Sequence, residues 1–171
     1  MKCSALWAVT ATLACGALQA QTNPLIAEMR ANYTNIKANL LRAAEKMPDE
    51  AYSYKPADSI RTFGALIGHI AGQYRACGAV LGQQKQIDTN KTSKADLVAA
   101  LKASFAVCDA AWEAMNDKTA VETMSGRGGN VSKLGMLIFM TVVHSNEEYG
   151  YLAVYMRMKN IVPPSSERSP M

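Results

Sequence analysis

Three side chains in this sequence could together bind a metal ion. The chain has only two histidines, and one of them, His144, stands four residues before Glu148. In a helix these two side chains project from the same face one turn apart, and that face is otherwise apolar. The other histidine, His69, lies in a second helical stretch that a helix bundle could bring opposite the pair. Two imidazoles and a carboxylate are a workable ligand set for Zn²⁺, Ni²⁺, Fe²⁺ or Mn²⁺, with positions left open for water.

The same three residues also suit a purely structural role. A buried histidine is usually hydrogen-bonded within the core, and Glu148 could form an ion pair with Arg75 or Arg157. The sequence has no HExxH motif, no Ser-His-Asp order and no nucleotide-binding fingerprint that would indicate another mechanism. Spacing alone therefore leaves a metal site and a hydrogen-bonded core both open, and it identifies no catalytic residue.

The elements that would hold these residues are predicted to be helices. Hydrophobic residues make up 49% of the 171 residues and aromatic residues only 7%, which favours one all-α domain over a β-sandwich. Apolar residues recur at three- and four-residue steps over four stretches: 24–47, 62–81, 93–115 and 131–160. Short connections would make these an up-and-down four-helix bundle or a close variant of one. Residues 116–130, which include a glycine-rich run, are predicted to be a flexible connector rather than an anion-binding loop.

Polar residues and glycines mark the boundaries of these helices. Asn23, Thr62 and Ser93 are predicted N-caps, and Asn160 is predicted to end the last helix. Five glycines fall in or at the end of the second stretch, and each interior one costs about 0.5–1 kcal/mol relative to alanine inside a helix. We expect the close approach of another helix or of a ligand to compensate for that cost.

The first twenty residues are predicted to be a secretory signal peptide and not part of the fold. A positive Lys2 precedes an apolar run at 5–14, and small residues lead to a predicted cleavage after Ala20. The run is too short to span a membrane, which takes about 20 residues. A lipoprotein signal, with Cys15 lipidated, is the alternative. We therefore expect a mature domain at 21–171 in the periplasm or outside the cell.

Net charge and cysteine content limit the partners and the compartment. The formal net charge of +4 comes from scattered basic residues, so no nucleic-acid partner is predicted. Removal of the signal leaves Cys77 and Cys108 as the only cysteines. In an oxidising compartment they could form a disulfide, or they could remain two buried thiols. Cys77 lies near the end of its predicted helix and Cys108 deep in the next, so a simple hairpin does not align them well.

Six separated segments carry a more specific pattern: MPDEAYSYKP at 47–56, IRTFG at 60–64, GHIA at 68–71, HSNEEYG at 144–150, VYMR at 154–157 and IVPPSS at 161–166. Together they resemble the DinB family, and most of all its exported branch. The resemblance covers essentially the whole mature chain. It implies a four-helix bundle in which three histidines hold a divalent metal. His69 and His144 match two of these histidines, and Glu148 stands at the position of the third.

The resemblance also implies a choice of functions. Family members include thiol S-transferases and proteins described as metal-dependent hydrolases, so this chain is expected to bind a divalent transition metal and to act on a small molecule. Replacement of the third histidine by Glu148 either gives a 2-His-1-carboxylate site or abolishes metal binding. In the second case the chain would be a non-catalytic, exported ligand-binding or stress-associated bundle. Relatives also often form homodimers through helix faces, and exported members often carry cysteines at positions matching Cys77 and Cys108.

Overall fold

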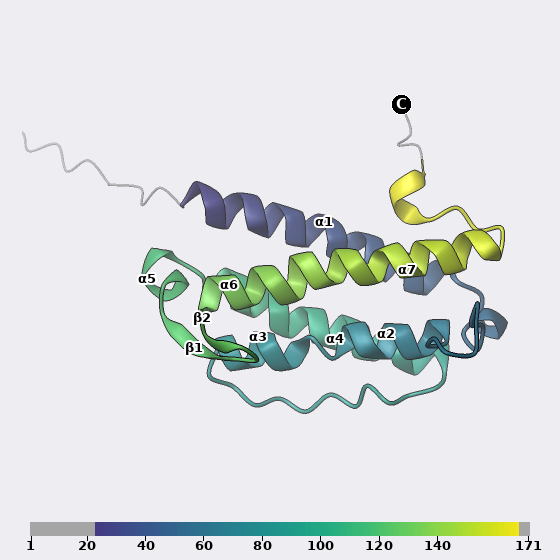
Figure 1. Cartoon of the computed structure of the whole chain (residues 1–171), viewed down its shortest axis with the longest axis horizontal. Helices are drawn as coiled ribbons and strands as arrows, with labels where there is room; N and C mark the ends of the chain where they lie inside the picture. Colours follow the sequence, from purple (N-terminus) through teal and green to yellow (C-terminus); the bar gives the residue numbers. More distant parts are fainter. Residues whose placement is uncertain (1–22, 168–171) are drawn as a thin grey trace, which may run out of the picture.

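Four helical rods packed side by side form the body of the protein (Figure 1). The structure is a computed structural model, and it describes residues 23–167. Within that range the rods are α1 (Pro24–Lys46); α2 (Phe63–Ala71) with α3 (Tyr74–Val80); α4 (Lys94–Glu113); and α6 (Lys133–Leu137) with a π-helix (Ile138–Val143) and α7 (His144–Met158). Short 3₁₀ turns at Asp49–Ala51 and Pro164–Ser166 follow the first and last rods. The predicted predominantly helical fold is confirmed.

The helices begin and end where side-chain chemistry predicts. The side chains of Asn23, Thr62 and Ser93 each accept a hydrogen bond from a backbone N–H in the first turn of α1, α2 and α4. Ser132 does the same for α6. Asn160 lies just beyond α7 with a φ of 57°, a left-handed conformation that stops a helix. All four cap positions named from the sequence are therefore confirmed.

The predicted second helix is two helices separated by a tight turn. The N–H of Gly72 donates to the carbonyl oxygens of both Gly68 and His69, at 3.2 and 3.0 Å, and the N–H of Gln73 donates to that of Ile70 at 3.1 Å. Bonds between residues three apart wind the chain more tightly than an α-helix does. The prediction of one continuous helix over 62–81 is corrected accordingly.

The third rod runs parallel to the second, not antiparallel to it. Residues 81–93 cross the length of the molecule and return the chain to the end at which α2 begins (Figure 1). As a result, Leu97 near the start of α4 packs beside Gly64 and Gly68 of α2. The rod order is therefore up, down, down, up, which is a variant of the up-and-down bundle and the second of the two arrangements expected from the sequence.

Parallel packing aligns the two cysteines of the described chain. Cys77 in α3 and Cys108 in α4 form a disulfide with an S–S distance of 2.03 Å and a Cα–Cα distance of 4.9 Å. Both residues are fully buried. The alternative of two free buried thiols is excluded. The hairpin mismatch expected from the sequence does not arise, because α3 and α4 run in the same direction.

Residues 116–130 are more ordered than the predicted connector. They contain the short helix α5 (Asp117–Ala120) and β1 (Thr123–Gly126), and β1 pairs antiparallel with β2 (Gly129–Ser132). Gly126 is opposite Gly129, so a two-residue turn closes the hairpin, and Gly129 has a φ of 127° that only glycine adopts without strain. The predicted last helix starts at Lys133 because residues 129–132 belong to this hairpin.

Some sequence predictions concern residues that lie outside the described range. The signal peptide at 1–20 and the alternative lipidation site at Cys15 fall there, and both stay predictions. Across residues 23–167, the helices lack the combination of length and hydropathy that a bilayer-spanning segment needs.

Candidate metal centre

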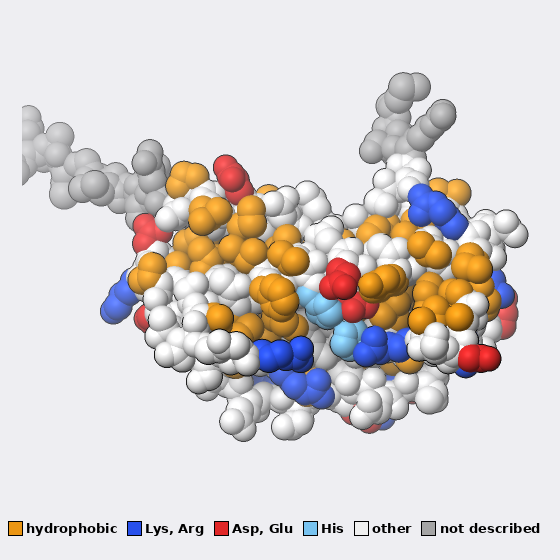
Figure 2. Space-filling model, in the orientation of Figure 1, with side chains coloured by type: hydrophobic (Ala, Val, Ile, Leu, Met, Phe, Trp, Pro, Cys, Tyr) orange, Lys and Arg blue, Asp and Glu red, His pale blue; other side chains and the backbone are white. Residues whose placement is uncertain are grey.

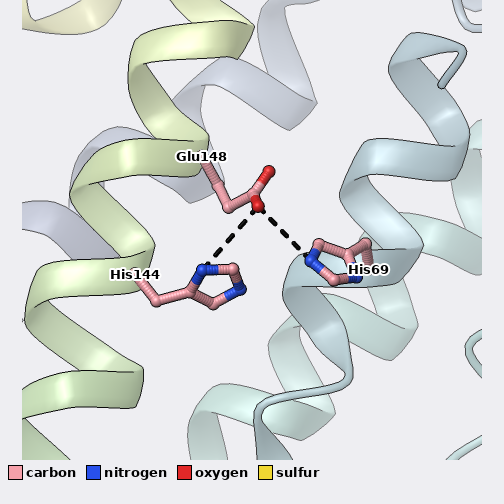
Figure 3. A group of neighbouring side chains, drawn as sticks. All are labelled: His69, His144 and Glu148. Atoms are coloured by element: carbon pink, nitrogen blue, oxygen red, sulfur yellow. Dashed lines mark ion pairs between the residues drawn. The ribbon is translucent and has the colours of Figure 1, made fainter. Parts of the chain in front are cut away.

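The structure brings the three side chains named from the sequence together between α2 and α7. The candidate ligand atoms of His69, His144 and Glu148 all lie within 4.8 Å of one another. The two histidines reach the surface, pale blue in Figure 2, whereas Glu148 is only 5% exposed. Figure 3 shows the Glu148 carboxylate between the two imidazoles. The expectation that the bundle would bring His69 opposite the other two is confirmed.

The distances within this group are short enough for its members to share one ion. His69 Nε2 is 3.3 Å and His144 Nδ1 is 3.7 Å from the same oxygen, Glu148 Oε1. N–H···O hydrogen bonds usually measure about 2.7–3.2 Å. Two ligand atoms each about 2.1 Å from one tetrahedral ion lie about 3.4 Å apart. The observed spacing therefore fits a site for a divalent metal held by two nitrogens and one oxygen.

Burial makes the Glu148 carboxylate an unusual group in this core. Its Oε2 atom is buried and has no hydrogen-bond partner among the described residues. An ionised carboxylate without a partner is strongly disfavoured in a protein interior. A cation bound between Glu148 and the histidines would supply the missing interaction.

The surroundings of the histidine on α2 favour its neutral form. Burial lowers the pKa of His69, and the positive charge of Arg61 lowers it further, while the nearby Glu148 carboxylate acts in the opposite direction. A neutral imidazole has a lone pair free to bind a metal, whereas an imidazolium does not. The electrostatic surroundings of His69 therefore favour the ligand form.

A π-helix leads directly into His144. The hydroxyl of Thr141 donates to the carbonyl oxygen of Leu137 at 2.7 Å and accepts from Trp112 Nε1 at 3.0 Å. These bonds tie the wide turn to α4. Such turns occur often at functional sites, because they reorient the side chains that follow them. The sequence periodicity placed Thr141 and His144 on the inward face but did not predict the π-helix.

A second polar contact sets the position of α7 relative to the turn that follows α2. The Ser145 hydroxyl, next to His144, donates to Gln73 Oε1 at 3.1 Å. Both residues are buried, and Gln73 stands in the turn four residues after His69. The hydrogen bond therefore links the two elements that carry the histidines. Sequence patterning gave no reason to single out Ser145, since a lone serine in a helix is common.

The ion pairs considered for Glu148 in a purely structural role do not form. Arg75 lies over the ring of Tyr74, at 5.0 Å from its centroid. Arg157 donates to Ser166 Oγ at 2.7 Å. Neither arginine is paired with Glu148, whose ionic contacts in the described chain are the two histidines.

Fold and site together define a helical bundle with a 2-His-1-carboxylate group between two of its rods. A family model described as the DinB superfamily matches residues 33–152, which is more than half of the chain. The chain therefore belongs to the DinB superfamily, as its sequence motifs predicted. No curated protein matches it.

Solved structures show the same fold at low sequence identity. A DinB-like protein from Bacillus cereus is 19% identical with a TM-score of 0.70, and the match covers 81% of this chain and 95% of that one. A DinB-like protein from Bacillus subtilis is 19% identical with a TM-score of 0.64, covering 83% and 99%. An uncharacterised protein from Escherichia coli is 14% identical with a TM-score of 0.61, covering 82% and 96%.

Proposed function

We propose that this DinB-superfamily protein is an exported, metal-dependent enzyme of the hydrolase or transferase type. The observation that carries the proposal is the buried Glu148 carboxylate, which faces two imidazoles at distances suited to a shared ion and has an oxygen without a partner. His69, His144 and Glu148 are the proposed ligands. When bound, a divalent transition metal acts as a Lewis acid that lowers the pKa of a coordinated water or thiol.

Each protein group has a distinct part in this proposal. The two imidazoles supply nitrogen ligands that suit Zn²⁺, Ni²⁺ or Fe²⁺, while the Glu148 oxygen also suits Mn²⁺. The carboxylate lies on the buried side, and the histidines lie at the surface where a small substrate can reach them. The Ser145–Gln73 hydrogen bond keeps the two histidine-bearing elements in register.

Export supports the hydrolase branch of the proposal over the transferase branch. The disulfide between Cys77 and Cys108 supports export, because such bonds persist in oxidising compartments. Outside the cytosol a low-molecular-weight thiol co-substrate is poorly available. The predicted signal peptide at 1–20 points to the same compartment.

Metal content of the untagged mature protein, residues 21 onward, tests the proposal directly. We expect plasma mass spectrometry to find about one equivalent of a transition metal. His69→Ala, His144→Ala and Glu148→Gln should each lower metal affinity, by roughly tenfold or more, because each removes a ligand. Any metal-dependent activity found in a substrate screen should be lost in the same variants.

Glu147→Gln is the matched control. Glu147 neighbours Glu148 and is 3.7 Å from His144 Nδ1, but its side chain is 60% exposed. This variant should keep its metal, because Glu147 lies on the solvent side of the group. Absence of metal from the wild-type protein, even after reconstitution, would contradict the proposal and favour a non-catalytic ligand-binding bundle.

The homodimer that the resemblance implies stays a prediction. Exposed apolar side chains follow the outer side of α7 and favour such a contact: Val143, Tyr151, Val154 and Met158 are each 51–53% exposed. Hydrophobic side chains, orange in Figure 2, gather over parts of the face that α7 occupies.

A further inference from the structure

A cavity of about 480 Å³ opens beside His69. It lies between α2 and the long crossing segment that connects α3 to α4. Three basic residues, Arg61, Arg75 and Lys91, contribute to its wall. Among the described residues that line it, none is acidic. Figure 2 shows blue side chains on both sides of the pale blue histidines.

Two of these cations are not neutralised by a neighbour. Lys91 pairs with Asp88 at 2.9 Å. Within residues 23–167, by contrast, neither Arg61 nor Arg75 has a carboxylate within 4.0 Å. Two guanidinium groups that share one cavity repel each other, so the arrangement is most favourable with an anion between them.

A backbone contact holds Arg61 at the cavity, and the Arg75 guanidinium lies next to Gly72. The hydroxyl of Tyr155, on α7, donates to the carbonyl oxygen of Arg61 at 2.7 Å. The Arg75 guanidinium lies over Gly72, where a Cβ would come within 3.1 Å of its Nη1 atom. Gly72 therefore borders the Arg75 guanidinium at the cavity.

The crossing segment closes the cavity from the other side. A Cβ at Gly68 would lie 2.4 Å from the carbonyl oxygen of Thr89. Only glycine permits so close a backbone approach. The contact seats Thr89 against the residue directly before His69, and Asn90 and Lys91 line the same cavity.

We propose that this cavity binds the anionic group, a carboxylate or a phosphate, of a small organic substrate, with Arg61 and Arg75 as its main partners. Arginine pairs with both groups through two parallel hydrogen bonds. A volume of about 480 Å³ exceeds what an oxyanion alone fills and leaves room for an organic portion that reaches His69. The inference deepens the proposed function, because it names the class of substrate that would be held beside the metal site.

Calorimetric titration of the purified mature protein tests this assignment. The probes are benzoate, phenyl phosphate and inorganic phosphate, with benzyl alcohol as an uncharged counterpart. We expect at least one organic anion to bind more tightly than inorganic phosphate, and benzyl alcohol not to bind. Arg61→Gln and Arg75→Gln should each weaken anion binding about tenfold, since a charge-assisted pair is lost. Arg127→Gln, which removes the same charge in the exposed turn between β1 and β2, should leave binding unchanged.

The titrations are repeated on chelator-treated protein, and the metal content of every sample is measured. Anion binding that persists without metal and depends on both arginines supports the cavity even where the metal site fails. If the metal content is normal and neither Arg61→Gln nor Arg75→Gln weakens anion binding, this inference is overturned while the proposed function remains intact. Binding of inorganic phosphate alone would overturn the assignment to an organic substrate.

Discussion

At the residue scale, the decisive position is Glu148, where the family pattern implied a third histidine. A carboxylate in place of an imidazole reduces the charge of a divalent centre from +2 to +1 and adds an oxygen ligand. Arg61 is close enough to lower the pKa of His69, while the exposed Glu147 carboxylate lies 3.7 Å from His144 Nδ1. Glu148 therefore offsets the positive charge on the His69 side of the candidate site.

Another buried residue predicts how stability responds to alkaline pH. The hydroxyl of Tyr33 donates to Asp109 Oδ1 at 2.8 Å, and the residue is 2% exposed. Burial and this carboxylate raise the pKa of Tyr33 well above its usual value of about 10. Because the unfolded chain loses the proton first, the contribution of Tyr33 to stability should be constant below about pH 10 and fall above it. The slope per such tyrosine is about 1.4 kcal/mol per pH unit.

Urea unfolding at pH 8, 10 and 11 measures this dependence. Burial raises the pKa of Tyr52 as well, so Tyr33→Phe should flatten the alkaline decline without removing it. The same variant should lose stability at pH 8, because Asp109 loses a hydrogen bond. Tyr151→Phe, at an exposed position on α7, should leave the whole profile unchanged. An unaltered alkaline slope in Tyr33→Phe would contradict the prediction.

At the scale of elements, α2 is shaped by what packs against its glycines. Leu97 of α4 and Tyr52 both lie against Gly64, and the crossing segment lies against Gly68. These close contacts compensate for the low helix propensity of glycine, as the sequence led us to expect. The helix that carries His69 is thus held by two other parts of the chain.

Substitution of Gly68 by alanine should be destabilising. The added Cβ would meet the Thr89 carbonyl at 2.4 Å, and a backbone atom can move only if the crossing segment shifts. We expect Gly68→Ala to lower the free energy of unfolding by about 1–3 kcal/mol in urea titrations. Gly150→Ala is the control: nothing lies within 4 Å of a Cβ there, and the residue is exposed in α7. That variant should be neutral or more stable by about 0.5–1 kcal/mol. Equal effects of the two substitutions would show that the close approach is unimportant.

At the scale of the molecule, the disulfide joins the two parallel rods. Its residues are 31 apart in sequence, and the closed loop contains the whole crossing segment that lines the cavity. A cross-link of this kind restricts the unfolded chain, and more so for longer loops. The bond therefore stabilises the least regular connection in the described fold.

Reduction of this bond should cost the protein about 3 kcal/mol of unfolding free energy. The measurement is urea unfolding with and without reductant, and alkylation before reduction should find no free thiol among the mature residues. A Cys77→Ala/Cys108→Ala double variant should have the same free energy of unfolding as the reduced protein, and reductant should not change it. If reductant lowered the stability of that variant, the loss of stability in the wild-type protein could not be assigned to this disulfide.

The sequence by itself determined the local features of this protein. The caps at Asn23, Thr62 and Ser93 and the apolar stripes follow from hydrogen bonding and periodicity within a few residues. The pairing of His144 with Glu148 on one helical face follows from the same geometry. Family motifs extended this to the fold class and to the meeting of these residues with His69.

Only the tertiary structure decided how the rods are arranged. The parallel run of α4 and the contact of Ser145 with Gln73 each depend on residues far apart in the chain. Periodicity reports which face of a helix is buried but not the direction of the helix packed against it. The cavity between Arg61 and Arg75 exists for the same reason, because the path of a long connection, rather than a local pattern, closes it beside His69.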